Sequence, residues 1–250
     1  MEHWRDQAIV LHARSHGEGG AIVSLLSEHH GRHAGFVHGA LSERRRALLQ
    51  GGSRVQADWQ ARTADNLGTF TLEPEAGLSP TLYESAVKLA ALKSACALCH
   101  EALPEREGHP GLYHGFLTLI DALEEHDEKQ PLWAVTYLGW ELAFLRELGF
   151  PLALHKCAGG GDAQTLTHIS PKSGRAVSAA QAAPYKEKLL PLPNILRPEA
   201  ARDEALETGG FADILVGLDM TGYFLEHWAF THHTQGVPMA REAFVDKLSA

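Results

Sequence analysis

Five short apolar runs, separated by turn signals, occupy the first eighty residues and constrain the fold more than any other feature of the chain. Apolar Val55, Ala57 and Trp59 alternate with polar residues, which is the period of a half-buried strand. Several short strands at this spacing favour a closed or nearly closed all-β unit. The five predicted strands contain residues 8–11, 21–26, 34–37, 55–59 and 67–72.

The segment between the third and fourth runs differs from its neighbours. Leucines at positions 41, 48 and 49, with polar residues between them, are enough for one or two helical turns. Five strands with a helical turn between the third and fourth is the layout of an OB-fold. The sequence therefore predicts an OB-fold barrel over residues 1–80, and an SH3-like barrel is the competing architecture.

After Pro80 the pattern changes to the 3.6-residue period of helices. Proline or glycine ends several of these runs, for example Pro104 after the first and Gly149 after the third. Residues 153–198, rich in Gly, Pro and Ser, are predicted to be irregular. We expect an α+β protein, with the barrel followed by a helical domain over residues 81–250 that carries this insert. Helices are predicted over residues 86–103, 110–125, 132–148, 200–207, 212–225 and 241–248.

Length and composition exclude several classes of protein. A chain of 250 residues with 44% hydrophobic residues fits two folded domains. No apolar run reaches the roughly 18 residues of a membrane helix, and the first residues do not have the pattern of a signal peptide. Three cysteines, an odd number, do not suit a secreted disulfide framework. These features predict a cytoplasmic protein with no membrane partner.

Charge is distributed unevenly along the chain. The formal net charge of −9 argues against a nucleic-acid partner, but steering of an anion depends on local potential more than on the sum. The arginine triplet at positions 44–46 and the net-basic segment 153–198 are the two basic regions. Guanidinium groups pair bidentately with phosphate oxygens, although a solubilising loop is the competing interpretation of the triplet. The predicted DNA contacts are Arg14, Arg32, Arg44, Arg45, Arg46 and Arg54 in the barrel, and Lys172, Arg175, Lys186 and Lys188 in the insert.

Aromatic residues of the barrel are a second candidate for contacts with bases. OB-folds often stack bases on aromatic side chains. Phe36, Trp59 and Phe70 lie in predicted strands, but their alternation suits the core better. We predict that they are core residues.

Clusters of cysteine and histidine are the candidates for a metal or redox site. Cys96 and Cys99 form a CxxC motif inside a long predicted helix, which indicates buried thiols. Seven histidines fall within the first 38 residues, but no pair combines i, i+4 spacing on a helix with a third ligand, because the predicted strands and turns scatter them. We interpret them as surface polar groups, and no metal site is predicted.

Catalytic motifs give no indication of an enzyme. The chain has no GxSxG, no P-loop and no HExxH pattern. The glycine-rich turn at residues 17–20 lacks the Lys-Ser/Thr pair of a Walker motif. The sequence therefore predicts a protein without catalytic activity.

A series of short motifs along the chain matches a known family. In their order and spacing they resemble the RecO family of bacterial recombination mediators, over nearly the whole chain. The motifs are Trp4–Leu11, His16–Glu18, His30–Arg32, Gly39–Ala40, Leu49–Gly51 and Leu67–Phe70, followed by Phe144–Phe150, Ser170–Arg175 and Leu189–Pro193.

The resemblance implies an amino-terminal OB-fold joined to a helical domain. It also implies a cytoplasmic, nucleoid-associated DNA repair protein of the RecF pathway that binds single- and double-stranded DNA and anneals complementary strands. Its implied partners are RecR and the single-stranded-DNA-binding protein, with which it loads RecA. The competing function is a protein-interaction adaptor whose barrel has lost DNA affinity, which the acidic total motivates.

Many members of the family carry a four-cysteine zinc site in the insert, and this chain departs from that pattern. Cys157 and Gly160 stand at the first CxxC pair, and Ser178 and Gln181 at the second. A tetrahedral thiolate site cannot be assembled from one sulfur. Two nearby histidines, at positions 155 and 168, would still leave a ligand missing, so no zinc or other cofactor is predicted.

The family's single-stranded-DNA-binding partner offers an acidic tail with an apolar end. Such a tail requires an apolar groove with a cation at its rim. Leu112, Phe116 and Leu119 lie at helical spacing, and Arg106 precedes them as a candidate carboxylate clamp. The competing interpretation is that this stripe is the buried face of a helix.

Overall fold

A computed structural model describes residues 1–40, 42–197, 210–234 and 236–250, without the side chain of Arg44. The chain divides into two compact units, residues 1–124 and 125–250. The domain boundary predicted near residue 80 falls inside the first unit, at the end of the barrel. The helix predicted over residues 200–207 lies outside the described residues.

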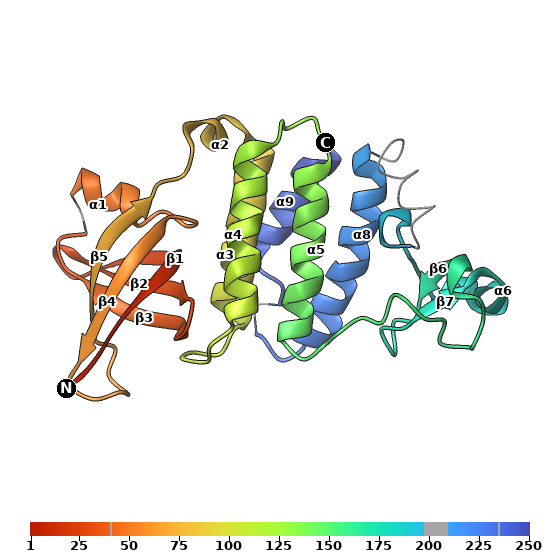
Figure 1. Ribbon diagram of the computed structural model, residues 1–250, viewed down its shortest axis with the longest axis horizontal. Helices are drawn as coiled ribbons and strands as arrows, with labels where there is room; N and C mark the ends of the chain where they lie inside the picture. Colours follow the sequence, from red (N-terminus) through yellow and green to blue (C-terminus); the bar gives the residue numbers. More distant parts are fainter. Residues whose placement is uncertain (41, 198–209, 235) are drawn as a thin grey trace. The chain divides into compact units, whose positions relative to one another are not determined.

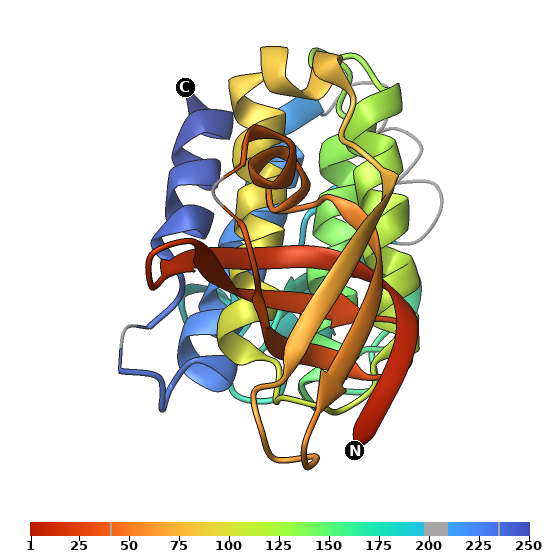
Figure 2. The same cartoon turned by 90° about the vertical axis from the view of Figure 1, so that its left-hand side faces the viewer.

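The first unit begins with a barrel of five strands in the order β1-β2-β3-β5-β4 (Figure 1). The first half of β1 pairs with β4 and the second half with β2, and β1 curves accordingly (Figure 2, red). β3 and β5 run parallel and close the barrel through a single pair, Phe36 and Thr69. This is the strand order of an OB-fold, so the predicted architecture is confirmed. The strands are β1 (Glu2–His16), β2 (Gly20–Ser27), β3 (Gly31–Val37), β4 (Arg54–Ala61) and β5 (Thr69–Ala76), with α1 (Glu43–Leu48) between β3 and β4.

Alternate strand residues fill the interior of the barrel. Trp59 and Phe70 belong to this core, as predicted, together with smaller residues such as Val23 and Leu25. The indole nitrogen of Trp59 donates a hydrogen bond to the carbonyl oxygen of Leu67, at 3.0 Å. The one polar atom of this buried ring is therefore satisfied.

Three helices complete the first unit: α2 (Pro80–Glu84), α3 (Ala86–Ala102) and α4 (Pro110–Glu125). Helix α3 packs against β1, and its N-cap Ser85 accepts a hydrogen bond from the backbone N–H of Lys88. Cys96 and Cys99 are buried in this helix. Burial raises the pKa of the Cys96 thiol to about 12, which agrees with the interpretation of these cysteines as buried thiols.

The second unit contains three long helices: α5 (Leu132–Glu147), α8 (Gly210–Phe224) and α9 (Met239–Ser249). Helix α8 packs against both of the others and continues into a π-helical turn, η4 (Leu225–Ala229). Within the described parts of the chain, no helix combines the length and apolarity needed to cross a membrane.

The insert of the second unit is more regular than the sequence indicated. It contains a three-stranded antiparallel sheet in the order β7-β6-β8. The strands are two to four residues long, which is too short for an alternating pattern to be recognised. The elements are η1 (Ala163–Thr165), β6 (Leu166–Ile169), β7 (Ala176–Ser178), α6 (Ala179–Ala182), η2 (Ala183–Lys188), β8 (Leu190–Pro191) and η3 (Asn194–Leu196).

Candidate nucleic-acid interface

One end of the outer face of β1–β3 is covered by the helices of the first unit. Ile9 and Leu26 pair across β1 and β2 and are fully buried, although neither belongs to the barrel core. Arg32, which pairs with Leu26, turns its guanidinium toward the end of α3. Its Nε donates to the carbonyl oxygen of Leu103 at 2.6 Å, and its Nη1 lies 3.1 Å from a carboxylate oxygen of Glu105.

The edge of this covered region is marked by two stacked histidines. His12 of β1 stacks on His100 of α3, with ring centroids 4.7 Å apart. Burial lowers the pKa of His100, and the neighbouring His12 lowers it further. Both effects disfavour a charged ring at this position.

Beyond this edge the outer face of the strands is open. Arg14, Ile22 and Phe36 form a row across β1, β2 and β3, with Arg14 exposed and the other two half-buried. The ring of Phe36 lies between the edges of His16 and His38, at centroid distances of 6.2 and 4.7 Å.

A glycine allows the Phe36 ring to lie directly on the neighbouring strand. A Cβ atom at Gly20 would come within 2.0 Å of the ring. Any larger residue at position 20 would therefore push the phenyl ring away from the sheet. Phe36 was predicted to be a core residue, and that prediction is wrong, because the ring lies outside the barrel core and keeps an exposed side.

Two arginines of α1 extend the open region. The guanidinium of Arg45 donates a hydrogen bond to the carbonyl oxygen of His38, at the end of β3. Arg45 and Arg46 are both exposed in the last turn of the helix, and the side chain of Arg44 is outside the described part of the chain. We call the set Arg14, His16, Phe36, His38, Arg45 and Arg46 the open face.

The open face has the chemistry of a single-strand-binding surface. Arginines supply fixed positive charge that pairs with phosphate oxygens. The half-buried Phe36 ring offers its open side as a platform on which a base can stack.

Arg54, a further predicted phosphate contact, has partners within the fold. Its Nη2 lies 2.5 Å from a carboxylate oxygen of Asp121 and 3.5 Å from one of Glu124. These pairs join β4 to α4. Arg32 is similarly bound at the end of α3. Because both guanidinium groups already bind partners within the first unit, we do not include Arg32 and Arg54 in the interface.

The four predicted basic residues of the insert are all exposed. Lys172 and Arg175 lie in and after the turn between β6 and β7, and Lys186 and Lys188 lie in η2. Burial lowers the pKa of His168, and Lys186 lowers it further, which places a cation near this ring. The insert therefore exposes cations on two segments, the β6–β7 turn and η2.

The groove predicted on α4 is contradicted by burial. Leu112, Phe116 and Leu119 are 1%, 0% and 0% exposed, so they form core and not a surface groove. Arg106, at a backbone φ of 64°, directs its guanidinium to the carbonyl oxygens of Ala64 and Asn66. This arginine thus holds the loop between β4 and β5.

The position of the family's zinc site keeps one thiol and a set of hydrogen-bond donors. The backbone N–H of Ser178 donates to Cys157 Sγ at 3.3 Å, and the Ser178 hydroxyl lies 3.4 Å from the same sulfur. Burial raises the pKa of this thiol, but hydrogen bonds from Ser178, Gly159 and Gly161 outweigh it and bring the pKa to about 7. A hydroxyl and amide N–H groups are not zinc ligands, so these residues do not fit the four-cysteine site.

The fold defines a two-unit α+β protein whose first unit carries an OB-type barrel. Two family profiles match the chain: Recombination protein O N terminal over residues 1–75, and Recombination protein O C terminal over residues 83–226. The chain belongs to the RecO family of DNA repair proteins.

Several relatives named DNA repair protein RecO are similar along nearly their whole length. The relative from Rhodospirillum centenum is 45% identical over 246 residues, covering 98% of this chain and 94% of the relative. The relative from Rhodospirillum rubrum is 44% identical over 250 residues, covering 99% and 97%. The relative from Caulobacter vibrioides is 42% identical over 248 residues, covering 98% and 97%.

Proposed function

We propose that this protein is a recombination mediator that binds single-stranded DNA on the open face. Membership of a DNA repair family supports the general role. The observation that carries the proposal is the row of Arg14, Ile22 and Phe36, to which His38 joins Arg45 of α1. This row combines cations with a stacking ring. The exposed cations of the insert supply a second surface, for duplex DNA or a second strand.

The finer activities follow from the family resemblance. We propose that the protein binds single- and double-stranded DNA, anneals complementary strands and acts without catalysis of its own. With RecR, it would load RecA onto DNA covered by the single-stranded-DNA-binding protein, whose tail it would contact elsewhere than on the buried α4 stripe. Such a protein would work in the cytoplasm at the nucleoid.

A salt titration of DNA binding tests the role of the open face. Replacing Arg44, Arg45 and Arg46 with alanine should weaken binding of labelled single-stranded DNA for all sequences. The dependence of log K on log salt should flatten by roughly 0.7 units for each arginine–phosphate pair that the substitutions remove. Arg5→Ala is a matched control, because Arg5 is an exposed arginine of β1 paired with Glu73 and outside the open face.

An unchanged salt dependence in the triple variant would remove the α1 arginines from the interface. A further arm tests the insert. Charge reversal at Lys172 and Arg175 should lower duplex binding or annealing, since both cations are exposed. Normal annealing by that variant would confine the DNA site to the barrel.

A protein-interaction adaptor without DNA affinity is the second candidate. The net charge of −9 and the internal ion pairs of Arg32 and Arg54 favour it. The same titration separates the two functions, because an adaptor would show no single-strand binding even at low salt, where electrostatic attraction is strongest.

A further inference from the structure

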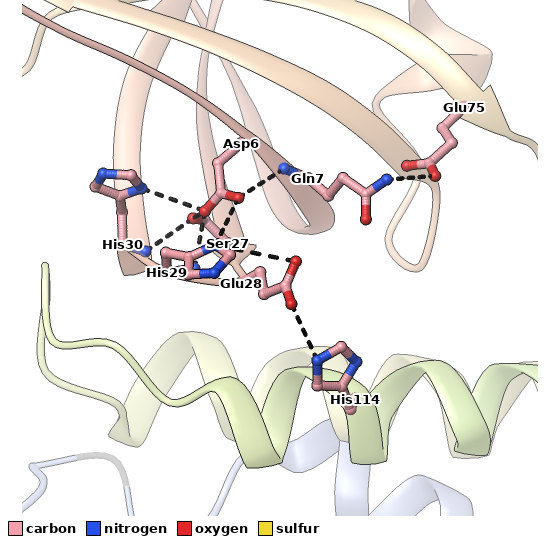
Figure 3. Close-up of polar contacts among 8 residues, drawn as sticks. All are labelled: Asp6, Gln7, Ser27, Glu28, His29, His30, Glu75 and His114. Atoms are coloured by element: carbon pink, nitrogen blue, oxygen red, sulfur yellow. Dashed lines mark hydrogen bonds and ion pairs between the residues drawn. The ribbon is translucent and has the colours of Figure 1, made fainter.

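Side chains of Asp6, Glu28 and His29 lie close together at the turn between β2 and β3, and His114 of α4 contacts Glu28 (Figure 3). Nδ1 of His29 lies 3.1 Å from Oδ1 of Asp6 and 3.9 Å from Oε2 of Glu28. Nε2 of His114, on α4, lies 3.0 Å from the other carboxylate oxygen of Glu28. One ligand atom from each of Asp6, Glu28 and His29 lies within 4.8 Å of the others.

These separations suit a small divalent cation. Zinc binds histidine nitrogen and carboxylate oxygen at 2.0–2.2 Å in tetrahedral geometry, which places neighbouring ligand atoms roughly 3.3 Å apart. The distances from Nδ1 of His29 to the carboxylates of Asp6 and Glu28, 3.1 and 3.9 Å, bracket that value. Imidazole together with carboxylate favours zinc and similar transition metals over calcium and magnesium, which take oxygen ligands.

The surrounding residues fix the Asp6 carboxylate in place. Its Oδ2 accepts hydrogen bonds from the Ser27 hydroxyl and the backbone N–H of His29, and Nδ1 of His30 lies 3.2 Å from it. His30 is itself stacked on Trp4, with ring centroids 4.4 Å apart. Oδ1 is thereby directed toward the His29 ring, and outer-shell contacts of this kind orient ligands in metal sites.

An ion can reach the cluster. The side chains of His29 and His114 are 69% and 62% exposed, whereas that of Asp6 is 7% exposed. The cluster therefore combines an anchored carboxylate with an accessible imidazole, that of His29.

We propose that Asp6, Glu28 and His29 form a binding site for a divalent transition-metal ion, with zinc as the best-fitting one. His114 of α4 contacts the other oxygen of Glu28 and would orient that carboxylate as an outer-shell residue. The ligands come from β1 and the β2–β3 turn, and their spacing in the sequence, from Asp6 to Glu28 and His29, has no metal-binding pattern that could have indicated the site. The prediction of no metal from the sequence rested on spacing alone.

Metal titration of the purified protein tests the proposal. Zinc should bind at one tight site per chain in isothermal calorimetry and raise the thermal midpoint, because it binds only the folded unit. Magnesium and calcium should do neither. Cobalt(II) should give the visible absorption of a tetrahedral nitrogen–oxygen site without a thiolate charge-transfer band.

Variants assign the ligands. His29→Gln should abolish the tight site, and His114→Gln should weaken it by at least ~10-fold. His3→Gln is the matched control, because His3 forms a similar exposed pair with Asp58, at 3.0 Å, elsewhere on the barrel. Cys157→Ser should bind zinc as the wild type does, which would exclude the single thiol of the insert as a ligand. If circular dichroism shows that a histidine variant is misfolded, Glu28→Gln tests the site in its place. This substitution keeps the shape of the side chain but removes the carboxylate charge.

Three results would overturn the proposal. The wild-type protein could bind zinc only weakly and at several sites, as surface histidines do. The histidine variants could bind as tightly as the wild type. The tight site could disappear in Cys157→Ser or His3→Gln, which would move it to another part of the chain.

Discussion

Arg241 and Glu141 form a buried ion pair that joins α9 to α5, with Nε of Arg241 2.7 Å from Oε1 of Glu141. Glu141 is 0% exposed. Its carboxylate also accepts hydrogen bonds from the hydroxyls of Thr221 and Tyr137. A second Arg241 nitrogen donates to the carbonyl oxygen of Leu218 at 2.7 Å. The buried charges are thus compensated as a network, which is the condition for keeping them out of water.

Removing one partner of this pair should destabilise the protein strongly. Arg241→Met leaves the Glu141 carboxylate buried without its counter-charge, which costs about 3–5 kcal/mol in comparable cases. Urea denaturation monitored by circular dichroism would show the loss as a lower midpoint. The double variant Arg241→Met with Glu141→Leu should recover part of it. A single variant as stable as the wild type would contradict the network.

His33 should make the stability of the barrel depend on pH. Its ring is 3% exposed, and its nitrogens have no hydrogen-bond partner among the described residues. Burial lowers the pKa of His33 to about 4, and the charges of Arg106 and His30 add to the effect. Because the folded pKa lies below the unfolded value of about 6.5, the neutral ring stabilises the fold fully above pH ~6.5. That contribution is lost as the pH falls toward 4.

The pH effect can be isolated with an apolar variant. Between pH ~6.5 and 4, titration of His33 should lower the unfolding free energy of the wild type by up to ~3 kcal/mol. His33→Phe removes the titrating ring but keeps its contacts with Trp4 and Trp59, at centroid distances of 5.1 and 4.6 Å. The difference in unfolding free energy between the two proteins should therefore change over that pH range. A constant difference would show that His33 has the same pKa in the folded and the unfolded chain.

Cys157 should be the first of the three cysteines to react with an alkylating reagent. Its pKa of about 7 makes a large fraction thiolate at neutral pH, and the thiolate is the reactive form. Burial raises the pKa of Cys96 to about 12, and that of Cys99 also rises. Limited treatment with iodoacetamide, followed by peptide mass spectrometry, should place the label on Cys157. Ser178→Ala should slow the labelling, and equal labelling of all three thiols would contradict the assignment.

The parts of the fold that the sequence predicted have strong local patterns. The alternation at residues 55–59 and the helical stripes of α3, α4 and α5 come from side chains that are close in sequence. Which of these side chains face the core follows from the geometry of the helix or strand that carries them. The OB-type barrel followed from the number and order of such elements.

The parts that it missed depend on contacts between distant residues. β3 carries apolar residues or glycine at four successive positions, 34–37, so no period distinguishes its two faces and Phe36 was assigned to the core. Arg32 and Arg54 look like free cations in sequence, but their partners are 73 and 67 positions away. The Leu112 stripe was ambiguous, because an amphipathic helix buries its apolar side whether or not a partner exists.

Phe36 should contribute to single-strand binding through stacking and not through charge. Stacking of a base on an aromatic ring is worth about 1–3 kcal/mol, so Phe36→Ala should weaken binding by roughly 5- to 150-fold. Because no cation is removed, the salt dependence of binding should stay as in the wild type. Phe36→Tyr should retain affinity, whereas Phe36→Leu should lose most of it while still covering Gly20. Fluorescence anisotropy with a labelled oligonucleotide at several salt concentrations measures both quantities. Equal affinity of the leucine and tyrosine variants would mean that the ring packs on the strand without contacting DNA.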